Sequence, residues 1–239
     1  MVAFSPGLRC RAFALGKDLN FSDETDDAFA VNTAAGRFAI ADGASTSAFA
    51  AAWARILATT FVENRNRWSV WLPLARDRWE QECRRDEMPW YLQEQFADGA
   101  LATLTGVVFR GKRRWRAAAV GDSCLFHVRR ERVCRVFPIR AYSDFNQTPA
   151  LLCSRAEAPG RQTSRLRIEG DWLQGDLMLL ATDALSQWFL GQVEDGKEPW
   201  RELVALERQD AFTAWISEHR RSNSIRPDDV TVLIIDSLA

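Results

Sequence analysis

Four aspartates in this sequence could do chemistry together, because each one stands at the end of an apolar segment predicted to be a strand. They are Asp27, Asp42, Asp183 and Asp228. A single aspartate in such a place is usually an ordinary turn residue. If the strands are neighbours, however, the carboxylates meet at one edge of a sheet and raise one another's pKa. A pair of hard divalent cations removes this repulsion, and oxygen-only ligands suit magnesium or manganese.

The elements that must position these aspartates include both strands and helices. Strands are predicted over residues 28–31, 37–41, 101–109, 115–120, 125–128, 132–139, 176–182 and 230–236. Helices are predicted from a cap at Ser45 or Thr46 to Phe61, over residues 74–96 with a break at Pro89, over 184–190 and over 200–219. The strands of residues 101–139 are typical of an antiparallel meander, and residues 142–160 of a surface excursion. Antiparallel strands with segregated helices indicate an α+β architecture.

Composition and charge limit the classes of function. Of the 239 residues, 47% are hydrophobic and 26% are charged, which is typical of a chain that buries a substantial core. The net charge of −1 provides no broad field for nucleic acid or an anionic membrane. The arginine clusters at residues 110–116 and 129–135 are therefore interpreted as solvated strand faces and hairpin ends. An odd number of cysteines without metal-binding spacing, and no long apolar run or signal peptide, favour a reducing cytoplasm.

Short motifs around the aspartates follow one another along almost the whole chain. They are Asp26-Asp27-Ala28-Phe29-Ala30-Val31, Ala39-Ile40-Ala41-Asp42-Gly43, Ala102-Thr103-Leu104, Gly121-Asp122-Ser123, Ala181-Thr182-Asp183 and Asp228-Asp229-Val230-Thr231. In these motifs and their order the sequence resembles the type 2C metal-dependent serine/threonine protein phosphatases (PPM-type phosphatases), with the bacterial-like branch the nearest in pattern. The resemblance implies a single domain over residues 1–239. It also implies a central antiparallel β-sandwich flanked by helices on both sides, in four αββα layers.

The resemblance further implies roles for individual residues. Asp42 would bridge two divalent cations, manganese or magnesium, and the carbonyl of Gly43 would bind one of them. Asp183 and Asp228 would ligate the other cation. The pair Asp26-Asp27 would act in catalysis from the inner or water-mediated shell of the cations.

Two further acids and one departure complete this pattern. Asp98 matches the position that holds a third cation in some family members. Asp122 would shape a hairpin and support the site rather than bind metal directly. Ser22 stands where the family often has the arginine that holds the substrate phosphate, so the phosphate-binding residue is unknown from the sequence. The candidates to replace it are Lys17, Arg9 and Arg11.

The predicted function is hydrolysis of phosphoserine and phosphothreonine in proteins. Two cations would lower the pKa of a water molecule between them, and this water would attack phosphorus in line, without a phosphoenzyme. The expected partner is a phosphorylated protein with a cognate serine/threonine kinase in the cytoplasm, and no nucleic acid or membrane is expected. One alternative is a phosphatase-like binding or regulatory module with little or no turnover. The missing arginine favours this module, as does Ala184, which stands where the family usually has glycine. Another alternative is a phosphatase that acts on a small molecule or nucleotide.

Overall fold

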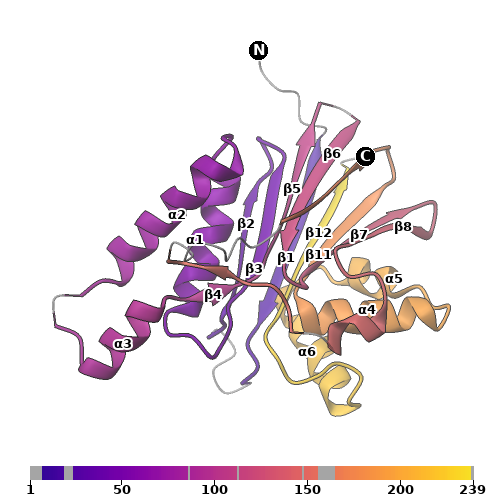
Figure 1. The fold of residues 1–239 in the computed structure, drawn as a ribbon. Helices are drawn as coiled ribbons and strands as arrows, with labels where there is room; N and C mark the ends of the chain where they lie inside the picture. The colour runs from indigo at the N-terminus through magenta and orange to yellow at the C-terminus, as the bar shows by residue number, and fades with distance from the viewer. Residues whose placement is uncertain are drawn as a thin grey trace.

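The computed structural model describes residues 7–18, 24–85, 87–111, 113–146, 148–155 and 165–237. Its strands form two five-stranded antiparallel sheets, which stack face to face with helices on the outside of both (Figure 1). The predicted α+β class and the four-layer αββα sandwich are confirmed by this arrangement. Among the helices of the described residues, none is both long and apolar enough to cross a bilayer.

Each sheet combines strands from distant parts of the chain. The first sheet has the order β1-β12-β11-β7-β8, formed by Leu8–Leu15, Val230–Ser237, Leu177–Ala181, Cys124–Arg129 and Arg132–Phe137. The second sheet has the order β10-β6-β5-β3-β2, formed by Leu166–Asp171, Arg114–Val120, Leu104–Arg110, Arg37–Asp42 and Asp27–Asn32. A short pair joins β4 (Leu101–Ala102) to β9 (Leu152–Cys153). The strands beside the predicted aspartates are therefore neighbours, β2 with β3 and β11 with β12.

The two sheets are held together by apolar side chains on their inner faces. Phe38 and Ile40 of β3 contact a core that also contains Leu180 of β11 and Leu233 of β12, all almost fully buried. Successive side chains of a strand point to opposite faces, so the inner residues alternate with those that face the helices. Burial of this apolar area is the main force that stacks the two sheets.

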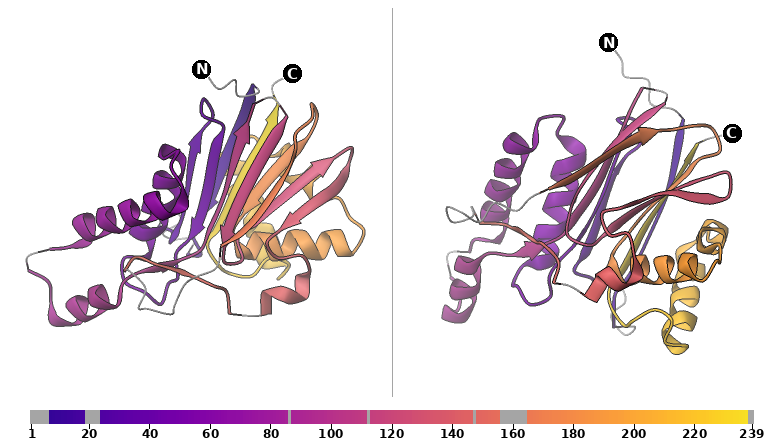
Figure 2. Two further views of the ribbon diagram at one scale, coloured as in Figure 1. Left: turned by 45° about the horizontal axis from the view of Figure 1, so that its top comes forward. Right: turned by 45° about the vertical axis from the view of Figure 1, so that its right-hand side comes forward.

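The helices cover the outer faces of the sheets, as both views of Figure 2 show. The outer face of the second sheet is covered by α1 (Ala50–Glu63) and α2 (Trp68–Cys83), with α3 (Trp90–Asp98) beyond them. The outer face of the first sheet is covered by α4 (Asp183–Glu194), α5 (Pro199–Ala205) and α6 (Gln209–Arg221). A 3₁₀ helix, Tyr142–Asn146, and β9 lie within the predicted surface excursion.

The predicted meander of residues 101–139 is wrong at one point. Strands β5 and β6 pair as expected, but β7 does not pair with β6, because the chain crosses to the first sheet at Gly121-Asp122-Ser123. Gly121 has a φ of 100°, and a Cβ there would come within 2.5 Å of the Thr103 side chain. Only glycine fits this turn without strain. The crossover carries Asp122 to the end of the sandwich where the other acids lie.

Other differences concern element boundaries. The first helix is not capped by Ser45 or Thr46: its N-cap is Phe49, in the left-handed region at a φ of 61°. The second helix begins earlier than predicted, at Trp68, and contains Pro73, whereas the break at Pro89 is confirmed. The segment of residues 200–219 forms two helices rather than one, and strands β1 and β10 were not predicted.

Candidate metal centre

The ends of β2 and β3 bring two of the predicted acids face to face. Asp27 and Asp42 are register partners across these two strands. Directly after Asp42, the Gly43 N–H donates to the Asp26 carbonyl at 3.1 Å. A Cβ at Gly43 would lie 2.7 Å from that carbonyl oxygen and 2.9 Å from the backbone of Ala50. The sequence Asp-Gly is therefore needed here for the close approach of three backbone segments.

Three carboxylates converge at this end of the sandwich. Asp42 at the end of β3, Asp122 in the crossover between the sheets and Asp183 at the start of α4 each have an oxygen within 4.8 Å of the others'. Burial is the main reason that the pKa of Asp42 rises to about 10, and the charges of Asp27, Asp183, Asp122 and Asp228 raise it further. Burial and the charge of Asp183 likewise raise the pKa of Asp122 to about 6. The cluster is thus short of positive charge.

Asp27 and Asp122 each have a buried oxygen without a protein partner. Thr182 donates its hydroxyl to Oδ2 of Asp27 at 2.8 Å, but Oδ1 of Asp27 has no hydrogen-bond partner among the residues that the structure describes. The same holds for Oδ1 of Asp122 within the described part of the chain. Burial holds the pKa of Asp27 well above its ordinary value, although the hydroxyl groups of Thr182 and Thr231 oppose this shift. Buried carboxylate oxygens without donors are costly, and a hard cation satisfies them. The donor set of this chain therefore fits divalent magnesium or manganese.

The segment before β12 adds two more aspartates with different surroundings. Asp228 is half-buried and accepts a hydrogen bond from Arg226 at 3.3 Å. Asp229 is buried, and its two oxygens accept the backbone N–H groups of Lys17 and Asp26, each at 2.7 Å. Asp229 thus fixes the backbone on which Asp26 and Asp27 are placed.

Arg226 is the cation that contacts the carboxylate cluster directly. Its guanidinium pairs with Asp183 and Asp228, and its Nη1 donates to Gln187 on α4 at 3.2 Å. The nearby Asp183 has a raised pKa because of burial, and the charge of Arg226 only partly offsets this. Sequence reasoning missed Arg226, although its place two residues before Asp228 was a usable signal.

The structure shows which of the three candidates for phosphate binding, Lys17, Arg9 and Arg11, lies near the carboxylate cluster. Arg9 pairs with Asp236 at 2.9 Å, and Arg11 donates to the backbone carbonyls of Val204 and Leu206 at the end of α5, so both are held in the first half of β1, away from the cluster. The Nζ of Lys17 lies 3.9 Å from Asp26 and donates to Ser45 at 2.9 Å, at the rim of the cluster. Ser22 falls outside the described residues. Of the three named substitutes, only Lys17 lies at the site.

Asp98 and the two histidines lie apart from the three converging carboxylates. Asp98 is exposed at the end of α3 and is not a member of the cluster formed by Asp42, Asp122 and Asp183. His127 is buried against Asp176, and His219 packs on Trp215 with ring centroids 4.2 Å apart. The side chains available for chemistry at the cluster are therefore carboxylates and two cationic groups, those of Arg226 and Lys17.

The fold and this acid cluster together match a known class of enzyme. The family model of protein phosphatase 2C matches residues 21–221 of the chain. The chain belongs to the protein phosphatase 2C family, a family of metal-dependent protein serine/threonine phosphatases that use manganese or magnesium ions. The resemblance seen in the sequence motifs is thereby confirmed.

Solved structures support the fold. The serine/threonine phosphatase PstP/Ppp of Mycobacterium tuberculosis has a TM-score of 0.67 at 16% identity, with 97% of this chain and 99% of that chain covered. The catalytic domain of PstP, solved with two manganese ions, has a TM-score of 0.60 at 19% identity and the same coverage. PppA of Pseudomonas aeruginosa, described as a regulatory component of a type VI secretion system, has a TM-score of 0.64 at 19% identity and covers 97% and 98% of the two chains. No curated protein matches the sequence.

Proposed function

We propose that this chain is a metal-dependent phosphomonoesterase that hydrolyses phosphoserine and phosphothreonine in proteins, acting as a single phosphatase domain. The observation that carries the proposal is the convergence of Asp42, Asp122 and Asp183 beside a buried oxygen of Asp27 that has no hydrogen-bond partner among the described residues. Such a site costs free energy unless cations bind there. The alternative of an inactive binding module is not favoured. Each position that matches a metal ligand of the family carries a residue with a donor oxygen in this chain.

Each residue has a definite task in this proposal. Asp42 would be shared by two cations, the Gly43 carbonyl would bind one of them, and Asp183 and Asp228 would hold the other. Asp122 joins this set, in contrast to the supporting role expected from the sequence, because its buried Oδ1 has no donor among the described residues. When bound, the cations supply Lewis acidity that lowers the pKa of a water molecule and stabilises charge on phosphoryl oxygens. Asp98 is the proposed ligand of a third cation.

The pair Asp26-Asp27 orders the opposite side of the site. Asp27 is held by the hydroxyl of Thr182, so its free oxygen has a fixed position. Asp26 is half-buried near Lys17 and its backbone N–H is bound by Asp229. From these positions the two acids would orient water molecules in the inner or water-mediated shell of bound cations.

Removal and return of the metal provide the direct test of the proposed function. We expect purified protein to hydrolyse an aryl phosphate and phosphoserine or phosphothreonine peptides with manganese, to lose this turnover with a chelator, and to regain it with added manganese. Manganese at about 100 times its Kd should also stabilise the fold by about 2.7 kcal/mol, since it binds only the folded chain. Both readouts can be followed on one sample, by absorbance and by thermal unfolding. Stabilisation by manganese without turnover would favour the binding module, and turnover indifferent to chelator and manganese would contradict the proposal.

Arg226 is the proposed phosphate-binding residue. Its planar guanidinium is suited to bidentate contact with phosphoryl oxygens, and bound cations would compete with it for Asp183 and Asp228, which would free it for substrate. We expect Arg226→Gln to raise KM for an aryl phosphate and the inhibition constant of inorganic phosphate by about 10- to 100-fold, from the loss of a hydrogen bond to a charged group worth about 1.5–3 kcal/mol. Steady-state kinetics measures both values. The matched control, Arg221→Gln, removes an arginine that pairs with Glu218 on the exposed end of α6 and should change neither. Unchanged phosphate inhibition in Arg226→Gln would contradict this role.

The proposed partner is a phosphorylated protein, together with a cognate serine/threonine kinase. A cytoplasmic location is part of the proposal. It is supported by the five cysteines, all of which lie in described parts of the chain and are unpaired.

A further inference from the structure

A groove rich in arginine lies on the outer face of the second sheet, away from the carboxylate cluster. Its volume is about 610 Å³. We call it the basic groove, and it is lined by Arg67, Trp68, Ser69, Arg110, Arg116, Arg165 and Arg167. These residues come from the start of α2, from β5, β6 and β10, and from the residue before β10. The groove therefore joins segments that lie far apart in the sequence.

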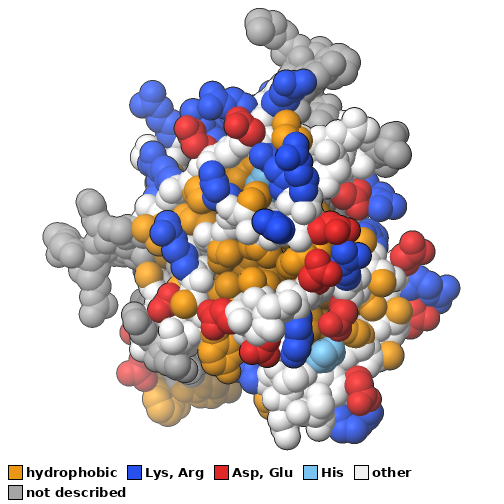
Figure 3. Space-filling model, turned by 90° about the vertical axis from the view of Figure 1, so that its right-hand side faces the viewer, with side chains coloured by type: hydrophobic (Ala, Val, Ile, Leu, Met, Phe, Trp, Pro, Cys, Tyr) orange, Lys and Arg blue, Asp and Glu red, His pale blue; other side chains and the backbone are white. Residues whose placement is uncertain are grey.

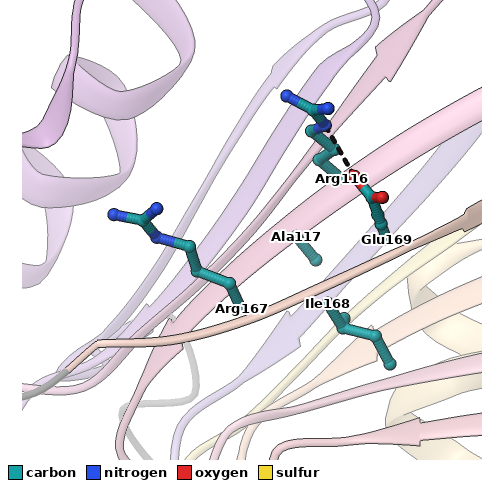
Figure 4. A pocket seen from close by; sticks show the side chains of 5 residues that line it. All are labelled: Arg116, Ala117, Arg167, Ile168 and Glu169. Carbon is teal, nitrogen blue, oxygen red and sulfur yellow. Dashed lines mark hydrogen bonds and ion pairs between the residues drawn. The ribbon is translucent and has the colours of Figure 1, made fainter.

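The strand pleat aims the guanidinium groups at this outer face. Figure 4 shows Arg116 and Arg167 leaving β6 and β10 on one side, while Ala117 and Ile168 point to the other. This alternation is the ordinary two-residue period of a strand, so the apolar side chains face the sandwich and the arginines face outward. The sequence alone indicates that the arginine cluster at residues 110–116 is a solvated strand face. The structure adds that Arg110 and Arg116 share one concave surface with three arginines from elsewhere in the chain.

Most of this positive charge is not neutralised by acidic side chains in the part of the chain that the structure describes. Arg116 pairs with Glu169 at 2.9 Å, but Arg67, Arg110, Arg165 and Arg167 form no ion pair with any residue that the structure describes. Arg165 instead lies over the ring of Trp68, 5.2 Å from its centre. The positive charge also affects the pKa of the nearby Arg37. Its pKa falls to about 10, mainly because of burial and further because of the charges of Arg110 and Arg65.

The face of the molecule shown in Figure 3 provides a contrast. Basic side chains gather on the upper part of that face, but acidic side chains lie among them. Elsewhere than in the basic groove, Arg129 pairs with Asp176 at 2.7 Å, Arg201 pairs with Glu131 at 2.8 Å, and Arg114 lies 3.7 Å from Asp171. The whole chain has a net charge of only −1, so the positive charge of the basic groove is confined to this part of the surface. Such a local concentration of positive charge attracts an anionic segment that fits the groove.

We propose that the basic groove binds an acidic segment of the protein substrate. The inference rests on the proposed function, because a protein phosphatase must hold a polypeptide whose phosphorylated residue enters the carboxylate cluster. Arg167 is the register partner of Ala118, which precedes Asp122 by four residues, so the groove begins about 13 Å from the cluster along β6. An extended peptide covers that distance in about four residues. The acidic residues are therefore expected roughly four to eight positions from the phosphorylated residue.

The test compares two triple variants with the same net charge. Arg67→Gln, Arg110→Gln and Arg167→Gln remove three unpaired arginines from the basic groove. Arg84→Gln, Arg85→Gln and Arg221→Gln remove three exposed arginines from the ends of α2 and α6. Binding of a fluorescently labelled glutamate-rich peptide is measured by anisotropy on metal-free protein, so this readout does not require turnover. The aryl phosphate assay is run in parallel with manganese.

We expect the groove variant to bind the acidic peptide at least about 10-fold more weakly, and to show the same rise in KM for an acidic phosphopeptide, while its aryl phosphate turnover stays unchanged. The binding should weaken as salt is raised, because exposed charges are screened. The control variant should keep wild-type values. Equal losses in both variants, or equally tight binding of a single-stranded oligonucleotide of the same charge, would overturn the inference. Absence of aryl phosphate turnover in the wild type would instead reject the proposed function, and the anisotropy result would still stand.

Discussion

Asp42→Asn is expected to lower turnover of an aryl phosphate by about 1,000-fold or more, because the proposed bridge between two cations stabilises the transition state by several kcal/mol. The same variant should be more stable than the wild type when both are metal-free. Asp42 is buried beside other carboxylates, and an amide removes a charge that this environment disfavours. Turnover with manganese is measured by absorbance, and the midpoint of unfolding with a chelator is measured by circular dichroism.

The pH dependence of stability gives this prediction a second readout. The pKa of Asp42 is raised from 3.8 to about 10 in the folded chain, mainly by burial and next by the charge of Asp27. Between these two values the folded state binds more protons than the unfolded state, so the metal-free wild type should lose stability as pH rises through this window. Asp42→Asn lacks this ionisation and should show a flatter profile.

Asp77→Asn, on the exposed side of α2, is the matched control for Asp42→Asn. It makes the same chemical change at an exposed aspartate outside the cluster of three carboxylates. Its turnover at saturating manganese should stay within a few-fold of the wild type, and its metal-free stability should not change. Full turnover in Asp42→Asn, or a metal-free protein destabilised by that substitution, would contradict the assignment of Asp42 as the bridging ligand.

The sequence predicted those site residues that can be recognised from the residues next to them. Asp27 and Asp42 could be placed because they end two adjacent strands of one hairpin, and the register pairs them directly. Asp183 could be placed because the buried run before it is long and apolar. In each case the neighbouring residues identify the strand end that carries the acid, and the stacking of the two sheets then brings these ends together.

Asp122 and Arg226 could not be assigned in this way, since their positions depend on contacts between distant segments. Asp122 reaches the cluster only because the chain leaves the second sheet at Gly121, where a meander would have kept it with β6. Arg226 reaches Asp183 only because β12 lies beside β11. The basic groove has the same origin, since its arginines belong to four separate segments of the chain.

The strands differ in the same way: some can be recognised from their own residues, and others depend on partners far away in the sequence. Strands with continuous apolar runs, such as β11 and β12, were predicted nearly at their observed bounds. Strand β1 was missed because Arg9 and Arg11 interrupt its apolar residues, and both arginines find partners only in the folded chain. Strand β10 was missed because it is an edge strand whose outward side chains are charged.

Asp176→Asn is expected to lower the free energy of unfolding by about 3 kcal/mol, because it breaks a buried network that holds β7 to the turn before β11. The side chain of Asp176 is 1% exposed and accepts hydrogen bonds from Arg129 at 2.7 and 2.8 Å and from His127 at 2.9 Å. The backbone N–H of Leu173 donates to it at 2.7 Å. An amide of the same size keeps the packing but leaves these donors without a charged acceptor. Urea denaturation of metal-free protein measures the loss, and a fall of roughly 6–12 °C in Tm should accompany it.

Asp171→Asn provides the comparison for Asp176→Asn, because the Asp171 carboxylate lies on the surface 3.7 Å from Arg114, with both side chains more than two thirds exposed. It should change the free energy of unfolding by less than about 0.5 kcal/mol. Burial opposes ionisation of Asp176, but hydrogen bonds from Arg129, Leu173 and His127 outweigh it and hold the pKa of this carboxyl below 3.8. Its contribution to stability is therefore present above pH 3.8 and is lost as pH falls through the lower folded value. The difference between Asp176→Asn and the wild type should accordingly shrink in acid, and a difference that stayed constant down to pH 2 would show that packing rather than charge holds this network together.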